Sequence, residues 1–313
     1  MRRIALTLLL PLLAVGVLAG CGGSTAPSAA SPVVTVSGSF GKAPAIKIPE
    51  QKAGGSLTVK TVIHGTGSTL ATTDAFVANY AIYVWSGTSH RLAQTNFGTH
   101  KPQFFPDRLV PGLKKALVGQ KMGSRVLAVI PPKDAFGTSG QPQAGIKGTD
   151  TLVFVMDLIK NFPANESAAG QHVSSGGGAL PKVIASTGAA PAIKMPSSKP
   201  PAKLVSKTLV KGSGPAIAKG QTVVVQYVGA VWKTGKVFDA SWKRGQPFGF
   251  TIDASPDQVI PGIDKGLTGE TVGSRVMLVV PPADGYGKAG NAQAGIKGSD
   301  TLVYVVDVLG AFS

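Results

Sequence analysis

Five segments in the C-terminal half of the chain largely alternate apolar and polar residues and are rich in β-branched side chains. These segments are residues 203–211, 221–232, 248–252, 274–280 and 300–309. Alternation with a period of two predicts β-strands. Residues 233–236 read Lys-Thr-Gly-Lys, which is typical of a turn, and residues 261–267 open with proline and predict the one short helix. The pattern therefore predicts an α+β domain, in which an antiparallel sheet wraps around a short helix.

The chain carries this pattern twice. Residues 111–157 and 261–307 align without a gap at an offset of 150, and 27 of the 47 aligned pairs are identical. Pro-Ala-Ile-Lys also recurs at residues 44–47 and 191–194. A period of this length indicates two whole domains rather than a solenoid. We predict a first domain over residues 38–162, a linker over 163–186 and a second domain over 187–313.

The N-terminus predicts export and a lipid anchor. Residues 1–20 begin with two arginines and continue with an apolar run, which is the order of a secretory signal peptide. Leu-Ala-Gly-Cys at residues 18–21 resembles the lipobox of bacterial lipoproteins. That resemblance implies that Cys21 is diacylated and holds the chain at the outer face of the cell membrane; an ordinary signal peptide followed by an unrelated cysteine is the alternative. Residues 21–37 are rich in Ser, Ala, Gly and Pro and predict a flexible tether.

Composition narrows the classes of protein further. A content of 41 glycines and 23 prolines argues against a helical protein. The net charge of +16 comes from scattered lysines without a basic run or stripe. We therefore expect no nucleic-acid partner and attribute the charge to a surface beside an anionic membrane or cell wall. The single cysteine excludes intrachain disulfides and argues against a thiolate metal site.

Several short motifs follow one another in the second domain. They are Val-Gln-Tyr-Val-Gly at 225–229, Val-Phe-Asp-Ala-Ser at 237–241, Gln-Pro-Phe at 246–248, Gln-Val-Ile-Pro-Gly at 258–262, Gly-Tyr-Gly at 285–287 and Thr-Leu-Val-Tyr at 301–304. This series resembles the FKBP family of peptidyl-prolyl cis-trans isomerases. The resemblance implies two FKBP-like domains, each an antiparallel β-sheet curled around one short α-helix with an apolar pocket between them. It implies no cofactor and no metal.

The resemblance also assigns site residues. The catalytic pocket walls would be Tyr227, Phe238, Asp239, Phe248, Val259, Ile260, Tyr286 and Tyr304, with Ile263 at the pocket floor and Ile296 nearby. In the family, the groups matching the Tyr286 hydroxyl and the Ile260 N–H are donors in the pocket, and the carboxylate matching Asp239 accepts a hydrogen bond from the hydroxyl matching Tyr227. Three positions depart from the family's usual residues: Ile263 replaces a frequent tryptophan, Asn291 a frequent histidine, and Tyr304 a phenylalanine.

The first copy lacks much of this set. Tyr80 matches Tyr227, and Leu109-Val110 replaces Val259-Ile260. Elsewhere Ala93-Gln94 replaces Phe238-Asp239, Gln103 replaces Phe248, and Phe136 replaces Tyr286. Because the framework glycines remain, we expect the first domain to fold but to have little or no activity.

These patterns favour an enzyme that isomerises X–Pro bonds in unfolded or exported proteins and assists their folding, mainly through its second domain. The family's macrolide ligands are further candidate partners, and the lipid bilayer is a partner through Cys21. A non-catalytic, client-binding chaperone scaffold on the same fold is the alternative. A solute-binding lipoprotein would need two α/β lobes, and the strand-rich repeat argues against it.

Overall fold

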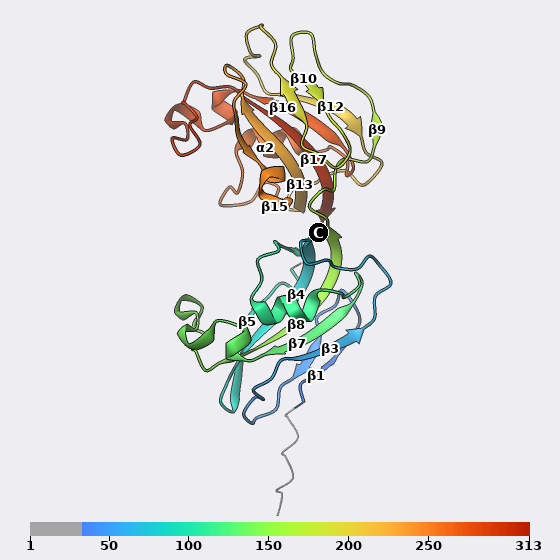
Figure 1. The fold of residues 1–313 in the computed structure, drawn as a ribbon, viewed down its shortest axis with the longest axis vertical. Helices are drawn as coiled ribbons and strands as arrows, with labels where there is room; N and C mark the ends of the chain where they lie inside the picture. Colours follow the sequence, from blue (N-terminus) through green and yellow to red (C-terminus); the bar gives the residue numbers. More distant parts are fainter. Residues whose placement is uncertain (1–32, 100) are drawn as a thin grey trace, which may run out of the picture. The chain divides into compact units, whose positions relative to one another are not determined.

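The computed structural model of the protein describes residues 33–99 and 101–313. The predicted signal peptide, Cys21 and most of the predicted tether lie outside these ranges. Within them, strands predominate and each copy of the repeat forms its own antiparallel sheet around one short helix (Figure 1). This confirms the predicted α+β class. No helix in the described ranges is long and apolar enough to span a membrane.

The first domain contains a six-stranded sheet with the order β3-β7-β8-β4-β5, in which β6 also pairs with β4. Its main helix, α1, spans Pro111–Leu117. Its strands are β1 (Thr35–Ser37), β2 (Ala45–Lys47), β3 (Thr58–Ile63), β4 (Ala75–Ser86), β5 (Ser89–Thr95), β6 (Gln103–Phe105), β7 (Arg125–Ile130) and β8 (Thr151–Phe162). Single 3-10 turns follow β7 at Pro132–Asp134, Gly137–Ser139 and Pro142–Ala144.

The second domain repeats this arrangement with the order β14-β13-β17-β16-β12-β9, and β15 also pairs with β13. Helix α2 spans Pro261–Leu267, the range that the sequence predicted. The strands are β9 (Gln171–His172), β10 (Lys182–Ile184), β11 (Ala192–Lys194), β12 (Val205–Lys211), β13 (Thr222–Val231), β14 (Val237–Ala240), β15 (Phe248–Thr251), β16 (Arg275–Val280) and β17 (Leu302–Phe312). Its 3-10 turns span Ser241–Arg244, Pro282–Asp284 and Gly287–Ala289.

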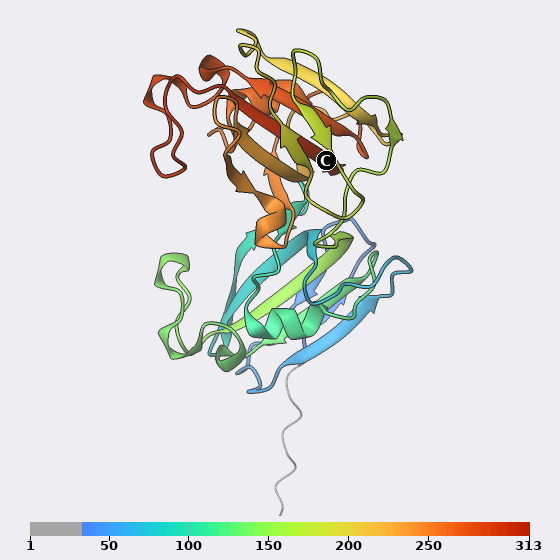
Figure 2. The same ribbon diagram turned by 45° about the horizontal axis from the view of Figure 1, so that its top comes forward.

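Each sheet packs one face against its helix. In the first domain α1 lies across the sheet, as Figure 2 shows, and Leu113 and Leu117 join the core there. In the second domain Leu267 of α2 and Leu278 of β16 lie in the equivalent core. A proline occupies the first turn of both helices, where its missing N–H leaves no intrahelical bond unmade.

Part of the opposite face of each sheet is also buried, because a short hairpin covers it. β1 pairs with β2 and β10 pairs with β11 in the same antiparallel register, 147 residues apart. Val183 of β10 lies in a second core with Leu209, Met277 and Trp232. As a result every residue of β7 and of β16 is buried. The alternating pattern alone indicated a single buried face, and the hairpins account for the difference.

The hairpins also move two predicted boundaries. β1 begins at Thr35, inside the segment predicted as tether, because Val34 and Val36 pack on the outer face of the first sheet. β9 and β10 lie inside the segment predicted as a linker over residues 163–186. β9 pairs with β12 and thus extends the second sheet. These segments belong to the domains that they cover.

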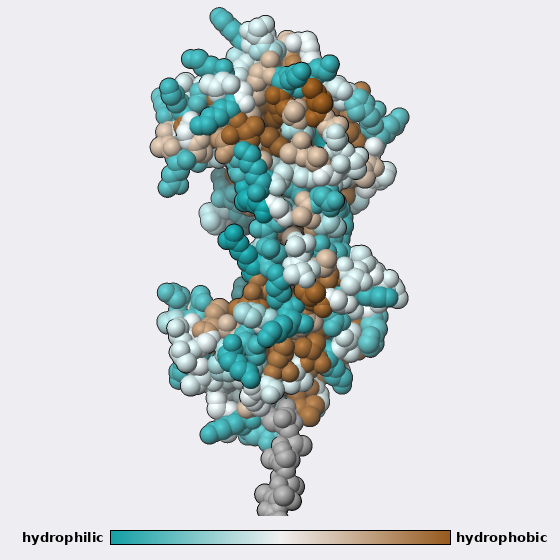
Figure 3. Space-filling view, viewed as in Figure 1, coloured by the Kyte–Doolittle hydropathy of each residue, from teal (hydrophilic) through white to brown (hydrophobic). Residues whose placement is uncertain are grey.

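Most of the surface seen in Figure 3 is hydrophilic, and apolar residues gather there in limited patches over each domain. Among the described residues, no group of three or more His, Cys, Asp or Glu side chains is placed to hold a metal ion.

Candidate active site of the second domain

The predicted pocket residues of the second domain come together around one cavity of about 440 Å³. It opens between the sheet, helix α2 and the loop that follows β16. Its lining includes Tyr227, Phe238, Asp239, Phe248, Val259, Ile260, Ile263, Tyr286 and Tyr304. The structure thus brings together nine of the ten residues that the family resemblance assigned, from four strands, one helix and two loops.

Ile296 is the exception. It is 4% exposed and packs in the core cluster of the second domain rather than among the residues that line the cavity. Its backbone forms a bridge with Asn291, with a nitrogen-to-oxygen distance of 2.8 Å in one direction and 2.9 Å in the other. Asn291 does line the cavity. Ile296 therefore holds the loop that presents Asn291.

Aromatic rings form most of the cavity wall. The Tyr227 and Phe248 rings meet edge to face at 6.0 Å between centroids, and Phe238 meets Tyr304 in the same way at 5.6 Å. Edge-to-face pairs place the positive ring edge against the negative ring face and so fix both rings. The wall is therefore rigid as well as apolar.

Gly229 of β13 allows two of these rings to approach the sheet. A Cβ atom at this position would lie 2.7 Å from Phe238 Cζ and 3.0 Å from Tyr304 Cε1. Both distances are shorter than the roughly 3.5–4.0 Å of an unstrained carbon contact. The narrow Phe238–Tyr304 corner thus requires a glycine beneath it, a constraint that the motif comparison did not reveal.

Three polar side chains form a network at the edge of the cavity. The Tyr227 hydroxyl donates to Asp239 Oδ2, and Arg244 Nη1 donates to Asp239 Oδ1. Arg244 Nη2 also donates to the Tyr227 hydroxyl at 2.9 Å, and its guanidinium lies 5.4 Å from the centre of the Tyr227 ring. Burial, together with the hydrogen bond to Asp239, raises the pKa of Tyr227 to about 12. Tyr227 therefore stays a neutral donor across the physiological pH range.

Sequence reasoning missed Arg244. It ends a short 3-10 turn, and Gly245, at a φ of 68°, terminates that turn. The only sequence signal was a basic residue five positions after Asp239, next to Lys243. A basic pair in a turn is usually an exposed surface feature, and the Arg244 side chain is in fact 41% exposed.

Two buried polar residues position this network from behind. The Ser241 hydroxyl accepts from the Tyr227 backbone N–H at 2.8 Å and donates to the Gln226 side-chain oxygen. Gln226 and Ser241 are both fully buried. Because buried polar groups are costly to leave unpaired, this pair fixes β13 and β14 side by side with Tyr227 facing the cavity.

The helix end supplies a backbone donor. Ile260 is the N-cap residue of α2 and precedes Pro261. Its carbonyl accepts a hydrogen bond from the Ile263 N–H at 2.9 Å. Within residues 33–99 and 101–313, the Ile260 N–H donates to no protein acceptor. Ile260 lines the cavity with Tyr286. A carbonyl group in the cavity can therefore meet a hydroxyl and an N–H donor.

Tyr304 is 4% exposed and lies against Tyr286 and Tyr227. Burial raises the pKa of Tyr304 well above its usual range, and the neighbouring Tyr286 raises it further. The side chain lines the cavity, so its hydroxyl adds a polar point to a wall that is otherwise apolar.

Strand register places the matching residues of the first domain without ambiguity. Gln94 pairs with Ile82 as Asp239 pairs with Gly229. Gln103 pairs with Ala78 as Phe248 pairs with Val225. The replacements inferred from sequence thus occupy the structural positions of the pocket walls. The register adds that Ile82 stands where the second domain has Gly229.

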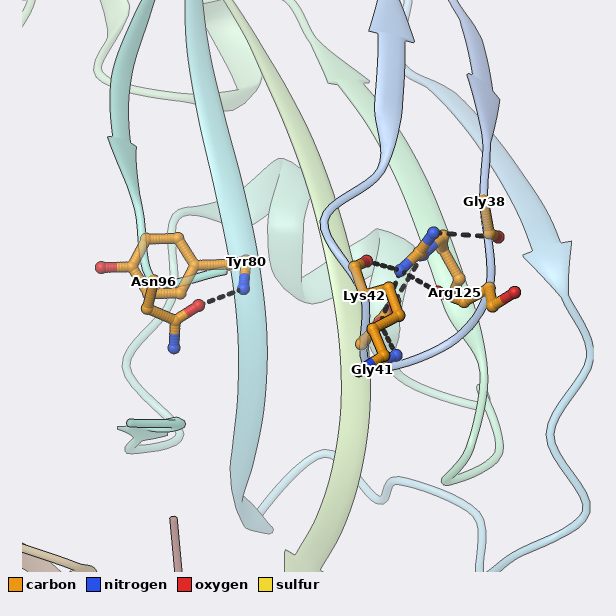
Figure 4. A network of polar contacts seen from close by, with 8 residues as sticks. Gly38, Gly41, Lys42, Tyr80, Asn96 and Arg125 are labelled. Carbon is orange, nitrogen blue, oxygen red and sulfur yellow. Dashed lines mark hydrogen bonds and ion pairs between the residues drawn. The ribbon is translucent and has the colours of Figure 1, made fainter. Parts of the chain in front are cut away.

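A branched side chain at Ile82 occupies the space that Gly229 leaves open for two rings, and it packs against the core of the first domain. The backbone N–H of Tyr80 donates to Asn96 Oδ1 at 2.7 Å (Figure 4), so Asn96 takes the role of Ser241. Tyr80 itself is 5% exposed. The first domain therefore keeps the support for its tyrosine but loses the carboxylate and the aromatic corner.

Known proteins share these features. Residues 72–159 and 214–309 match the FKBP-type peptidyl-prolyl cis-trans isomerase family. The chain is 42% identical over 119 residues to the FK506-binding protein of Streptomyces anulatus. The aligned region covers 38% of this chain and 94% of that protein. It is 36% identical over 121 residues to the probable FK506-binding protein of Corynebacterium glutamicum, and that alignment covers 39% of this chain and 98% of that protein.

A third relative is the FKBP-type peptidyl-prolyl cis-trans isomerase FkpA of Escherichia coli K12, with 42% identity over 106 residues, covering 34% of this chain and 37% of that protein. The crystal structure of Escherichia coli FkpA matches with 39% sequence identity and a TM-score of 0.32, covering 35% of this chain and 48% of that one. The two segments of the family match make up more than half of the 313 residues, and one lies in each domain. The chain therefore belongs to the FKBP-type peptidyl-prolyl cis-trans isomerase family and carries the family's domain twice.

Proposed function

We propose that the second domain isomerises X–Pro bonds in exported proteins at the outer face of the cell membrane, and that the first domain contributes little or no catalysis. One observation carries this proposal. The second domain has an aromatic cavity with a tyrosine–carboxylate–guanidinium network at its edge, and the first domain has lost the corresponding residues.

The chemistry needs only these groups. Rotation about a prolyl amide breaks no covalent bond, but the partial double-bond character of C–N sets a barrier of roughly 18–20 kcal/mol. Uncatalysed crossing takes on the order of tens of seconds. The planar amide is strongly dipolar, and twisting it reduces that dipole. A dry aromatic cavity therefore binds the twisted amide better than the planar one.

The polar donors hold the substrate chain while it rotates. In this proposal the Tyr286 hydroxyl and the Ile260 N–H, whose residues line the cavity, donate to carbonyls that flank the prolyl bond. Asp239 fixes Tyr227 through a hydrogen bond. Its negative charge lies at the cavity edge, where it repels the partially negative carbonyl oxygen of the planar amide. Lowering the barrier by about 5 kcal/mol through these effects would accelerate isomerisation several-thousandfold.

The proposed location rests on the N-terminal sequence. The basic and apolar leader and the Leu-Ala-Gly-Cys segment support export and anchoring through Cys21. A reaction that needs no nucleotide or metal suits a compartment outside the cell. The relatives named as FK506-binding proteins support a macrolide as a second ligand of the same cavity. Ile263 offers such a ligand a smaller apolar surface than an aromatic floor would.

The test is the isomerisation rate of a short X–Pro peptide with the full-length mature protein. We expect Tyr286→Phe to lower kcat/KM by about tenfold, because it removes one hydrogen bond that is made to the reacting chain. Tyr80→Phe in the first domain is the matched control and should leave kcat/KM unchanged. Wild-type protein that is folded but inactive would instead favour a client-binding scaffold without catalysis.

A further inference from the structure

Each domain contains a buried arginine–aspartate pair on its sheet, at matching positions 150 residues apart. Arg125 Nε donates to Asp157 at 2.6 Å, and Arg275 Nε donates to Asp307 at 2.5 Å. In both pairs Nη2 donates to the second carboxylate oxygen. The two domains therefore share a bidentate ion pair and differ in what meets the rest of the guanidinium group.

In the first domain the loop between β1 and β2 accepts hydrogen bonds from the rest of the Arg125 guanidinium group. Arg125 donates to the backbone carbonyls of Gly38 at 3.1 Å, of Ser39 at 2.9 Å and of Lys42 at 2.7 Å. The loop returns a bond from the Gly41 N–H to Asp157 at 2.6 Å. Figure 4 shows the loop wrapped around the arginine side chain. The Arg125 side chain is thereby fully buried, and each of its three guanidinium nitrogens has an acceptor.

In the second domain the matching loop, residues 185–191, accepts no hydrogen bond from Arg275. A guanidinium has five N–H donors, and within residues 33–99 and 101–313 only two of those of Arg275 have protein acceptors, both on Asp307. The Arg275 side chain is nevertheless only 8% exposed. The backbone N–H of Ala168 donates to Asp307 Oδ2 at 3.0 Å, as the Gly41 N–H donates to Asp157 in the first domain.

The two loops differ at three positions, Gly38/Ala185, Phe40/Thr187 and Lys42/Ala189, and the first of these changes the backbone conformation. Gly38 has a φ of 107°, a conformation that residues with a Cβ atom rarely adopt. Its counterpart is Ala185, which does not adopt a positive φ. The second loop therefore cannot take the path of the first and is held elsewhere, by the Gly188 N–H on the Ser167 hydroxyl at 3.2 Å.

Arg275 lines a cavity of about 380 Å³ instead. The polar lining consists of Arg275, Lys182, His172, Ser174 and Ser175, and it contains no carboxylate. The Ser174 hydroxyl oxygen accepts from the Gly176 N–H, which leaves its own proton free to donate. The cavity lies under the β10–β11 hairpin and is lined by none of the residues of the isomerase pocket.

We propose that this cavity binds a small oxyanion, a carboxylate or a phosphate group, through the N–H donors of Arg275 that Asp307 leaves free, with Lys182 and the Ser174 hydroxyl completing the site. The free edge of a guanidinium group matches two oxygens of such an anion. The anion replaces the carbonyl oxygens that satisfy Arg125 in the first domain. The site is independent of the isomerase activity.

The test is a titration of the full-length mature protein with inorganic phosphate and, separately, with acetate. Binding is followed by calorimetry and by the NMR signals of the Arg275 guanidinium N–H groups, which Arg275→Lys identifies. We expect saturable binding at one site per chain for at least one anion. The anion that binds more tightly identifies the chemistry of the natural ligand.

Two variants and one control locate the binding. Lys182→Gln should weaken it about twofold to fivefold, the usual effect of losing one exposed charge. Lys194→Gln removes the same charge from the paired position of the hairpin, but Lys194 does not line the cavity, so binding should be unchanged. Ala185→Gly should let the loop close over Arg275 and weaken binding by about tenfold or more.

Three results would overturn the proposal. They are no saturable shift of the Arg275 signal with either anion, equal weakening by Lys182→Gln and Lys194→Gln, and undiminished binding in a folded Ala185→Gly variant. Thermal unfolding of each variant verifies folding, and residue 185 lies outside the buried core.

Discussion

Gly229 lies on β13 beneath the corner where Phe238 and Tyr304 meet, so a methyl group at this position probes the cavity wall directly. An alanine Cβ would lie 2.7 Å from Phe238 Cζ and 3.0 Å from Tyr304 Cε1. An unstrained carbon contact needs roughly 3.5–4.0 Å. One or both rings must therefore move by about 1 Å, or the strand must bend away from them.

The displacement should affect stability and catalysis together. Forcing one methyl group into a packed apolar site costs about 1–3 kcal/mol of unfolding free energy. A shift of about 1 Å in the wall also misplaces the prolyl ring, and we expect kcat/KM to fall by about tenfold or more. Urea unfolding and the peptide isomerisation assay measure the two effects on the same preparation.

A matched control separates this effect from that of any glycine substitution. Gly55 does not adopt a positive φ, and a Cβ atom added to it would meet no heavy atom within 4 Å, so Gly55→Ala should change neither quantity. A Gly229→Ala variant with wild-type stability and wild-type kcat/KM would refute the inference that the aromatic corner depends on Gly229.

Three further changes test other parts of the molecule. Arg244→Met removes hydrogen bonds to Asp239 and Tyr227, so kcat/KM should fall by about threefold to tenfold; unchanged kinetics would show that the guanidinium does not support the network. The folded-state pKa of Tyr227, about 12, lies above the ordinary value of 10.0. The folded chain therefore holds more protons than the unfolded chain between these values, and unfolding free energy should fall as pH rises through that window. The loss of unfolding free energy from this group is about 2 kcal/mol once the partial exposure of the ring is allowed for. In the Tyr227→Phe variant this loss should be absent, which urea titrations at successive pH values measure. Val183→Ala removes methyl groups from the core under the β10–β11 hairpin and should cost about 1–2 kcal/mol in thermal or urea unfolding, without changing kcat/KM.

Much of the second-domain site could be predicted from sequence, because motif order and spacing fix strand register. A pairing slip of one residue would turn every side chain to the other face, so Tyr227 and Asp239 can meet in only one alignment. Helix α2 was predictable to the residue because Pro261 marks its start. The losses in the first domain followed from the same alignment.

Other features depend on tertiary contacts that no local pattern reveals. The strands of the two hairpins have only three residues each, too short for a periodic signal, and they form because the sheet offers an apolar face. Arg244 resembles an ordinary surface residue in sequence, and its role depends on the path of a single turn. Ile296 lies near the pocket motifs along the chain, yet its side chain packs in the core.

The proposed function requires that catalysis occurs in the pocket of the second domain. The most direct test is the kcat/KM for a short X–Pro peptide with the full-length mature protein in which Asp239→Val and Tyr286→Phe are combined. We predict that a folded double variant loses nearly all of the wild-type activity, although its first domain is intact. A double variant that kept most of that activity would contradict the assignment and place catalysis outside this pocket.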